Sequence, residues 1–497
     1  MRRWLILALL VVGIATATRA DLQIAQGNFA KRNGTGTQQV VISPAFTPKV
    51  IYFWGTNQTA TGGAVGGNDW FGVTSGTPAA QNFGVAAYNI DNVATSDARI
   101  RIAQQACVII TGPTAITVVG AATLSSFNSN GFTLSWGTSD TNAYIIYYIA
   151  LGGTDITNVL VGNRTWATST GNQAFTSVGF LPNFIHIIGG GDGTAVDTGT
   201  ADYLRDFGAA LSTSSRWTVA TSADDGDSMS PFVSGRSLVT TEMASKLNVS
   251  GSAVLAAADF VSFGSDGWTW NVTTAPASAH PFGFVAFNFA NVANNVAIGT
   301  FNKCTTTDCN SDVTTGQGTV KGVLLFSRGA TEGTTIVDDS RLAVGGSDFT
   351  NEGSLSASHY EPGAAGNTRV RQGISSSKAF ILMDLITLND VDAECDASAI
   401  ANGFRTTWTT SDGVATTIAY IAFGEAAAGA PVAPPRRAII ISGKQYAAWG
   451  QWHSESPARP LPKPWWREGA AAMGAAWLPA VMRWRGGRWS FEQQHFL

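Results

Sequence analysis

Aspartates clustered near glycines have the best spacing for metal chemistry in this chain. Asp224, Asp225 and Asp227 surround a glycine, and carboxylate oxygens are the ligands that Ca²⁺ prefers in extracellular modules. Their spacing does not match the loop of an EF-hand. Two looser groups have the same character: Asp192, Asp197 and Asp202, and Asp390, Asp392 and Asp396. We expect solvated acidic loops at these places. The alternative is weak Ca²⁺ binding, and no other cofactor is predicted.

Cys304 and Cys309 lie close together in a polar, turn-like segment. A zinc site would need further Cys or His side chains at close spacing, and the nearest histidine is His280. In an exported chain a short disulfide loop is the better interpretation, because disulfides persist in oxidising compartments. Cys107 and Cys395 stand in apolar segments and are predicted to be small core residues.

No motif in the sequence predicts catalysis. It contains no Gly-x-Ser-x-Gly nucleophile elbow, no P-loop and no dinucleotide-binding fingerprint. None of the histidines belongs to a His-Glu-x-x-His motif; they are His186, His280, His359, His453 and His495. We therefore predict no catalytic residue and a protein that is not an enzyme.

The composition favours short strands over helices. Apolar residues make up 44% of the 497 residues and charged residues only 13%, against roughly 25% charged residues in an average soluble domain. The 55 glycines suit tight turns. Residues 1–430 hold 21 Lys and Arg against 31 Asp and Glu, a balance of −10. This negative charge argues against nucleic acid as a partner.

Residues 1–20 have the order of a secretory signal peptide. Arg2 and Arg3 precede an apolar stretch, Trp4 to Ala15, which is too short to span a bilayer comfortably. Small residues follow at Ala15-Thr16-Ala17 and at Ala20, as at a signal-peptidase site. We expect residues 1–20 to be removed on export, and the alternative is an uncleaved apolar strand or anchor. The protein is accordingly expected to be secreted.

The chain repeats one pattern at a constant spacing. Gly131, Gly267 and Gly403 each follow Asn or Asp and open an aromatic segment, and 267 − 131 and 403 − 267 both equal 136. The apolar run 46–55 corresponds to 180–189 and more loosely to 318–326. A third landmark is Phe71-Gly72-Val73, matched with Phe207-Gly208-Ala209 and Leu342-Ala343-Val344. These landmarks define copy 1 (24–155), copy 2 (156–290) and copy 3 (291–427).

Each copy has the periodicity of strands. Every second residue is large and apolar in Phe132–Trp136, which predicts a strand with one buried face. The run Val50–Trp54 is apolar on both faces, as in a strand covered on both sides. We predict an all-β fold of three tandem β-sandwich or jelly-roll domains. The three copies could pack about a pseudo-three-fold axis, in place of a homotrimer.

Copy 1 contains Asn-Gly-Phe-Thr-Leu-Ser-Trp at 130–136, Ala-Tyr-Ile-Ile-Tyr-Tyr-Ile-Ala-Leu-Gly-Gly at 143–153 and Phe-Thr-Pro-Lys-Val-Ile-Tyr-Phe-Trp-Gly at 46–55. Together these segments resemble repeat domains of tailed-phage and prophage virion proteins. The resemblance covers most of 24–427 and rests on residues that form strands and turns. It implies a virion or tail-associated structural role and implies no catalytic residue.

Residues 428–497 differ in composition from the three copies. Seven of the 16 tryptophans lie there, interleaved with Arg and Lys. Residues 431–497 carry nine Lys and Arg against three Asp and Glu. Such a mixture suits a membrane interface, a glycan surface or a partner groove. The alternative is an irregular, disordered extension without a function of its own. Contact with a membrane is expected only through this tail.

Glycine, aromatic and aliphatic residues recur in all three copies, but no acid, base or nucleophile does. Ser139-Asp140 recurs as Ser411-Asp412 and is replaced by Ala275-Pro276 in copy 2, so we predict a turn. The preferred function is a non-enzymatic structural or adhesive protein of a virion or cell surface, which associates with itself or with other surface proteins. One alternative is a secreted lectin-like protein that binds surface glycans. The other is a secreted glycoside hydrolase or lyase on a jelly roll, which would need two facing carboxylates.

Overall fold

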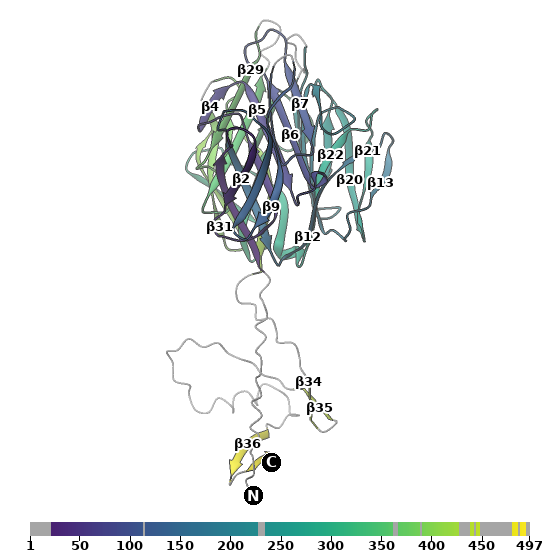
Figure 1. Cartoon of the computed structure of the whole chain (residues 1–497), viewed down its shortest axis with the longest axis vertical. Coiled ribbons are helices and arrows are strands. Elements are labelled where there is room, and N and C mark those ends of the chain that lie inside the picture. The colour runs from purple at the N-terminus through teal and green to yellow at the C-terminus, as the bar shows by residue number, and fades with distance from the viewer. Residues whose placement is uncertain are drawn as a thin grey trace. The chain divides into compact units, whose positions relative to one another are not determined.

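The computed structural model describes residues 21–112, 115–226, 234–360, 366–387 and 390–426, together with the backbone of four strands nearer the C-terminus (Figure 1). Strands dominate these residues, and the regular helical segments among them are the 3₁₀ turn η1 (Ala79–Gln81) and α1 (Val292–Asn295). The all-β prediction is confirmed. In the described chain no helix is long and apolar enough to cross a bilayer. The predicted signal peptide, 1–20, lies outside the described residues.

Copy 1 forms two antiparallel sheets. Its own strands in the large sheet have the order β1-β11-β3-β5-β6-β7, and the small sheet has the order β2-β10-β9-β8. The strands are β1 (Leu22–Ala30), β2 (Gly36–Val41), β3 (Pro48–Gly55), β4 (Gly62–Val65), β5 (Gly67–Thr74), β6 (Asn82–Asn89), β7 (Ala98–Ala103), β8 (Cys107–Thr111), β9 (Thr117–Asn128), β10 (Gly131–Ser139) and β11 (Ile145–Gly153).

Copy 2 repeats this topology, with a large sheet of order β12-β22-β14-β16-β17-β18 and a small sheet of order β13-β21-β20-β19. Its strands are β12 (Ile156–Thr165), β13 (Gly171–Phe175), β14 (Phe184–Gly190), β15 (Thr198–Ala201), β16 (Tyr203–Ala210), β17 (Arg216–Ala223), β18 (Ser234–Val239), β19 (Ala244–Leu247), β20 (Val254–Gly264), β21 (Gly267–Thr274) and β22 (Pro281–Phe289).

Copy 3 has a large sheet of order β23-β33-β25-β27-β28-β29 and a small sheet of order β24-β32-β31-β30. Its strands are β23 (Val296–Asn302), β24 (Cys309–Thr314), β25 (Thr319–Ser327), β26 (Gly333–Asp338), β27 (Ser340–Ser347), β28 (Glu352–Tyr360), β29 (Arg369–Ser375), β30 (Phe380–Met383), β31 (Val391–Ile400), β32 (Gly403–Ser411) and β33 (Thr417–Glu425).

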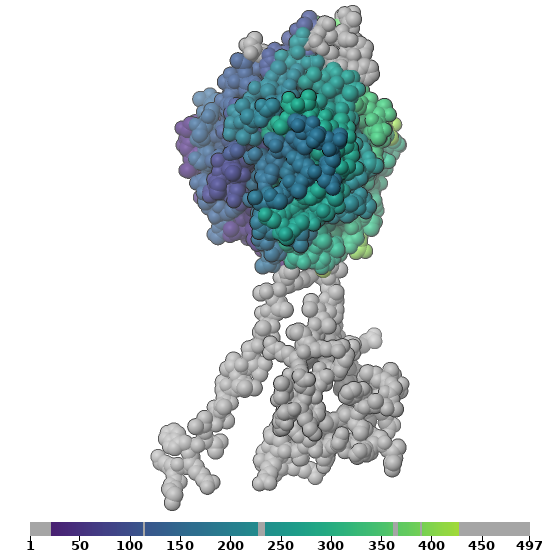
Figure 2. All heavy atoms as spheres, turned by 90° about the vertical axis from the view of Figure 1, so that its right-hand side faces the viewer, coloured from purple at the N-terminus to yellow at the C-terminus, as the bar shows by residue number. Residues whose placement is uncertain are grey.

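The seventh strand of each large sheet comes from another copy. β15 of copy 2 pairs with β7 of copy 1, β26 of copy 3 pairs with β18 of copy 2, and β4 of copy 1 pairs with β29 of copy 3. The exchange therefore closes a ring of three copies within one chain. Figure 2 shows copy 2 on the face towards the viewer, with copy 1 in purple on one side and copy 3 in green on the other.

A shared core lies where the large sheets of the three copies meet. One continuous cluster of buried apolar residues contains side chains from all three copies. Its centre is aromatic: the ring centroid of Phe207 lies 5.0 Å from those of both Phe71 and Phe326. Three further apolar clusters fill the interiors of the individual sandwiches. The large sheets are thus buried on both faces, which explains why a run such as Val50–Trp54 is apolar throughout.

Neighbouring copies also cover strand edges that a sandwich alone would leave open. The backbone N–H of Gln26 in β1 donates to the carboxylate of Asp348 in copy 3 at 2.8 Å. The N–H of Val161 in β12 donates to the hydroxyl of Ser75 in copy 1, also at 2.8 Å. Exposed strand edges can pair with foreign chains, and these contacts occupy one backbone N–H group on each of the edge strands β1 and β12.

One landmark of the sequence is corrected by the sheet register. Phe71 lies opposite Trp54, Phe207 opposite Ile188 and Val344 opposite Phe326. The third copy of the landmark is therefore Val344-Gly345-Gly346, a little later in the chain than Leu342-Ala343-Val344. The physical reason is a close approach between the two sheets of a sandwich. A Cβ at Gly72, Gly208 or Gly345 would lie 1.9 Å from a backbone oxygen of the facing segment, so only glycine fits there.

Residues 428–497 are not entirely irregular. They contain two hairpins, formed by β34 (Ala438–Ile441) with β35 (Lys444–Ala447) and by β36 (Ala480–Arg485) with β37 (Arg488–Gln493). These hairpins belong to a different unit of the chain from the three copies.

Phe207→Ala is expected to destabilise all three copies together. Phe207 is 1% exposed, and removing a buried phenylalanine ring costs about 3–5 kcal/mol. Calorimetry of the mature chain should show the main transition of the ring moving to lower temperature as a unit. Leu181→Ala is the control, because Leu181 is 50% exposed and its loss should change stability by less than about 0.5 kcal/mol. A shift confined to one of several separate transitions would contradict a shared core.

Candidate functional site

The acidic run of copy 2 lies at its junction with copy 1. Asp225 forms an ion pair with Arg99 in β7, and its Oδ1 accepts the backbone N–H of Ala98 at 3.0 Å. Asp227 lies outside the described residues. Within the described ranges no group of three or more His, Cys, Asp or Glu side chains is placed to hold a metal ion. Asp225 is therefore engaged in joining two copies, which differs from the solvated loop expected from the sequence.

The same contact recurs between copies 1 and 3. Asp91 in the turn after β6 forms an ion pair with Arg371 at 2.7 Å and accepts the backbone N–H of Val370 at 2.7 Å. In both cases the aspartate lies in the turn after an equivalent strand, β6 in copy 1 and β17 in copy 2, and binds an arginine of a neighbouring copy. This pair does not stand out in the sequence, because the ion-paired arginine recurs in two of the copies and Gly235 takes its place in copy 2. Arg99 and Arg371 occupy equivalent places, because 371 − 99 equals 272, which is twice 136.

Asp202 adds a second carboxyl group to the junction of copies 1 and 2. It directly follows the exchanged strand β15, and its backbone N–H donates to the carbonyl of Ala98 at 2.9 Å. Its Oδ1 accepts the N–H of Asp225 at 2.9 Å. Burial raises the pKa of Asp202 to about 7, together with a hydrogen bond to Asp224 and the charges of Asp224 and Asp192. Below about pH 7, Asp202 therefore keeps a proton, which lies in its hydrogen bond with Asp224.

The remaining aspartates of the two looser groups serve separate purposes. Asp197 accepts the backbone N–H of Gln104 at 3.0 Å, at the other end of β15. Asp392 forms an ion pair with Arg341, and Asp396 forms one with Lys378 at 2.9 Å. These contacts stabilise strand ends and sheet packing, and Asp392 and Asp396, both in β31, are bound to different basic side chains.

The proton on Asp202 should make the junction pH-dependent. In the unfolded chain Asp202 loses its proton near pH 4, whereas in the fold it keeps it to about pH 7. The fold binds more protons in this window, so the contribution of Asp202 to stability is fully present below pH 4 and is lost as the pH rises through 7. The Asp202→Asn variant should not show this loss of stability with rising pH. At pH 8 the melting temperature of the variant should therefore exceed that of the unsubstituted protein by about 1–2 °C. Asp197→Asn is the matched control at the other end of β15, and an identical pH profile for Asp202→Asn and the unsubstituted protein would contradict the shared proton.

A polar pocket of about 500 Å³ lies at the junction of copies 3 and 1. Its wall consists of the turn after β6 and the start of β29, and the lining residues are Asp91, Asn92, Gly366, Asn367, Thr368, Arg369 and Arg371. The side chain of Asn367 donates to the Oδ1 of Asn92 at 3.0 Å, and Thr368 donates to the carbonyl of Ile90 at 3.1 Å. The wall is thus formed by segments of two copies that are hydrogen-bonded to one another.

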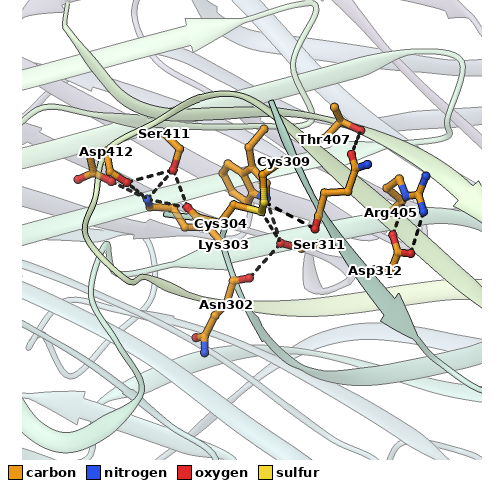
Figure 3. The surroundings of a disulfide bond; sticks show 12 residues. Asn302, Lys303, Cys304, Cys309, Ser311, Asp312, Arg405, Thr407, Ser411 and Asp412 are labelled. Carbon is orange, nitrogen blue, oxygen red and sulfur yellow. Dashed lines mark hydrogen bonds and ion pairs between the residues drawn. A yellow bond between two sulfur atoms is a disulfide. The ribbon is translucent and has the colours of Figure 1, made fainter. Parts of the chain in front are cut away.

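The structure joins Cys304 and Cys309 in a disulfide, which closes the turn between β23 and β24 (Figure 3). Cys309 is the first residue of β24 and lies opposite Trp408. Cys107 and Cys395 are buried free thiols, and burial raises the pKa of both. The reactive form of cysteine is the thiolate, so neither buried cysteine is suited to nucleophilic chemistry.

The recurring Ser-Asp pair holds a buried lysine. Lys31 donates to the hydroxyl of Ser139 at 2.6 Å and forms an ion pair with Asp140 at 2.9 Å. Lys303 makes the matching contacts with Ser411 and Asp412 (Figure 3). The pair is therefore more than the turn expected from the sequence, because it neutralises an ammonium group whose side chain is 0% exposed in both copies.

Copy 2 replaces this lysine with an aromatic residue. The backbone N–H of Trp166 donates to the carbonyl of His280, as that of Lys31 donates to the carbonyl of Tyr144. The ring of Trp166 stacks on Trp270 at 4.5 Å. Without a lysine at this place, copy 2 has no ammonium group to neutralise, which explains Ala275-Pro276 in place of Ser-Asp.

The histidines within the described residues are structural. His186 lies in the shared core, where neither ring nitrogen finds a hydrogen-bond partner among the described residues. Burial lowers its pKa to about 3, so it is neutral at physiological pH. His280 and His359 are also buried, and burial lowers the pKa of each. His453 and His495 lie outside the described residues.

Asp140→Asn is expected to destabilise copy 1 because it leaves the ammonium group of Lys31 buried without its countercharge. The expected loss is about 1–3 kcal/mol, measured by chemical denaturation. The double variant Lys31→Met/Asp140→Asn is the control. It should recover most of the loss, because an apolar side chain of similar volume needs no partner. Equal stabilities of the single and double variants would contradict this explanation.

A comparison of the sequence with models of known protein families finds no match, and a comparison with curated proteins finds none either. The site must therefore be interpreted from its geometry. That geometry consists of three junctions between copies, of which one carries a carboxyl pair and another a polar pocket with arginines.

Proposed function

We propose that this protein is a non-enzymatic structural or adhesive component of a virion, in a tail-associated position, or of a cell surface. The observation that carries the proposal is the closed exchange of strands among the three copies. A ring in which each copy completes the sheet of another is suited to presenting a fixed outer surface. It resembles a homotrimer built from one chain.

The positions of the first and last residues of the three-copy segment support this proposal. Lys321 at the start of β25 donates to Asp21 at 3.0 Å and forms an ion pair with Glu425 at 2.8 Å. The chain therefore enters and leaves the three copies at one place. Such an arrangement suits a head that is attached at one end and free at the other.

The recurring side chains also support it. The residues that repeat among the copies fill cores, occupy close approaches or neutralise buried lysines. The large exposed hydrophobic side chains of the described residues are aliphatic: Val41, Val65, Leu181, Val254, Val261, Ile386 and Val414. Sugar rings stack on exposed aromatic side chains, so this surface favours adhesion through polar and charged groups over stacking.

The carboxyl pair Asp202–Asp224 does not favour the hydrolase alternative. The two side chains are hydrogen-bonded to each other, whereas the carboxyl groups of glycosidases stand about 5–9.5 Å apart across the sugar. Asp202 is moreover tied to the exchanged strand β15.

Immunogold electron microscopy tests the proposal. Antibodies against the mature chain should label the outside of particles or cells from the source organism. Labelling confined to the cell interior would contradict a role at the surface. In parallel, the purified chain should release no reducing ends from a panel of polysaccharides, and such release would favour the hydrolase alternative instead.

A further inference from the structure

The polar pocket at the junction of copies 3 and 1 has a counterpart at the junction of copies 1 and 2. Arg371 and Asp91 form the ion pair at the first junction, and Arg99 and Asp225 form it at the second. The backbone N–H of Asn92 donates to the carbonyl of Thr368, and that of Gly226 donates to the carbonyl of Ser96. The two junctions therefore share one backbone framework, and their side chains can be compared place by place.

The two junctions carry opposite charges at matched places of this framework. Arg369 stands two places before Arg371, and Asp97 stands two places before Arg99. The junction of copies 1 and 2 also carries the carboxyl pair Asp202–Asp224. At the junction of copies 3 and 1, Gly66 takes the place of Asp202. Gly66 directly follows the exchanged strand β4, as Asp202 directly follows β15. An arginine at position 369 is thus not required to build a junction. Its cationic charge distinguishes this pocket from the junction of copies 1 and 2.

Arg369 is exposed and held in position. Its guanidinium lies over the ring of Tyr360, 5.9 Å from the centroid, a contact that restrains an arginine without neutralising it. Arg371, by contrast, is only 8% exposed, and its charge is neutralised by the ion pair with Asp91. The Nε of Arg371 is buried and has no hydrogen-bond partner among the described residues.

The rest of the wall is uncharged and polar. Asn92 and Asn367 supply amide groups, whereas the buried hydroxyl of Thr368 is already hydrogen-bonded within the wall. Amides bind the hydroxyl groups of sugars, and a guanidinium binds a carboxylate through two parallel hydrogen bonds. A saccharide that carries a carboxylate offers both kinds of group at once.

We propose that this pocket binds an acidic saccharide, with Arg369 pairing with the sugar carboxylate. The proposal rests on the adhesive function proposed above and names its ligand class. The pocket lies at the far end of the large sheet of copy 3 from Lys321. Val323, beside Lys321, lies opposite Ser347 at one end of β27, whereas Arg369 lies opposite Tyr360, beyond the other end of β27. Figure 1 shows β4 and β29 together at one end of the ring.

Saturation-transfer NMR on the full mature chain tests the site with three probes. These are oligosaccharides ending in glucuronic or sialic acid, sulfated oligosaccharides of the same length, and their neutral parents. The carboxylated probes should bind, and Arg369→Ala should weaken them by about 10- to 100-fold, the effect of losing a charged hydrogen-bonded pair. Asp97→Ala at the matching place of the other junction is the control and should leave binding unchanged.

Four results would overturn the assignment. They are no binding of any probe, equal binding of the neutral parents, equal or stronger binding of the sulfated probes, and full binding by an Arg369→Ala protein with an unchanged melting temperature. The ligand site and the surface function can fail separately. If Arg369→Ala leaves saccharide binding unchanged and immunogold labelling still finds the protein on the outside of particles or cells, only the assignment of the ligand site is wrong.

Discussion

The last strand that each copy contributes to its large sheet has backbone N–H and C=O groups that pair with a strand of another copy. β7, β18 and β29 obtain partners from β15, β26 and β4, and unpaired backbone groups at a buried edge are costly. This constraint brings the three large sheets together. Their inner faces then form the shared core around Phe71, Phe207 and Phe326. The polar junctions lie where the exchanged strands meet their new sheets.

Joining the three copies in one chain lets each of them diverge. In a homotrimer every substitution appears three times around the axis, whereas here it appears once. At matched places of the large sheets, Asp69 of copy 1 and Arg205 of copy 2 form an ion pair at 3.1 Å, and copy 3 has Leu342. Both charged side chains are 1% exposed, so each needs the other, and the pair forms only when copy 1 and copy 2 are neighbours in this order.

The same freedom gives the junctions different chemistry. The junction of copies 1 and 2 holds a carboxyl pair with a raised pKa, and the junction of copies 3 and 1 holds Arg369 beside an intact ion pair. The framework beneath them is common, since both use a turn aspartate, an arginine and a backbone N–H. The side-chain chemistry of the junctions therefore differs without changing the interactions that close the ring.

Strand periodicity and the constant spacing of the repeat can be read directly along the chain, so the sequence alone determined the all-β class, the three copies and strands with two buried faces. The close pairing of Cys304 with Cys309 is also local. Only the tertiary structure decided that Asp225 meets Arg99 and that Asp91 meets Arg371, because the members of each pair lie in different copies, far apart in the sequence. Which copy completes which sheet likewise depends on contacts between distant segments. The exchanged strands β4, β15 and β26 are so short that their own residues do not indicate which sheet they join.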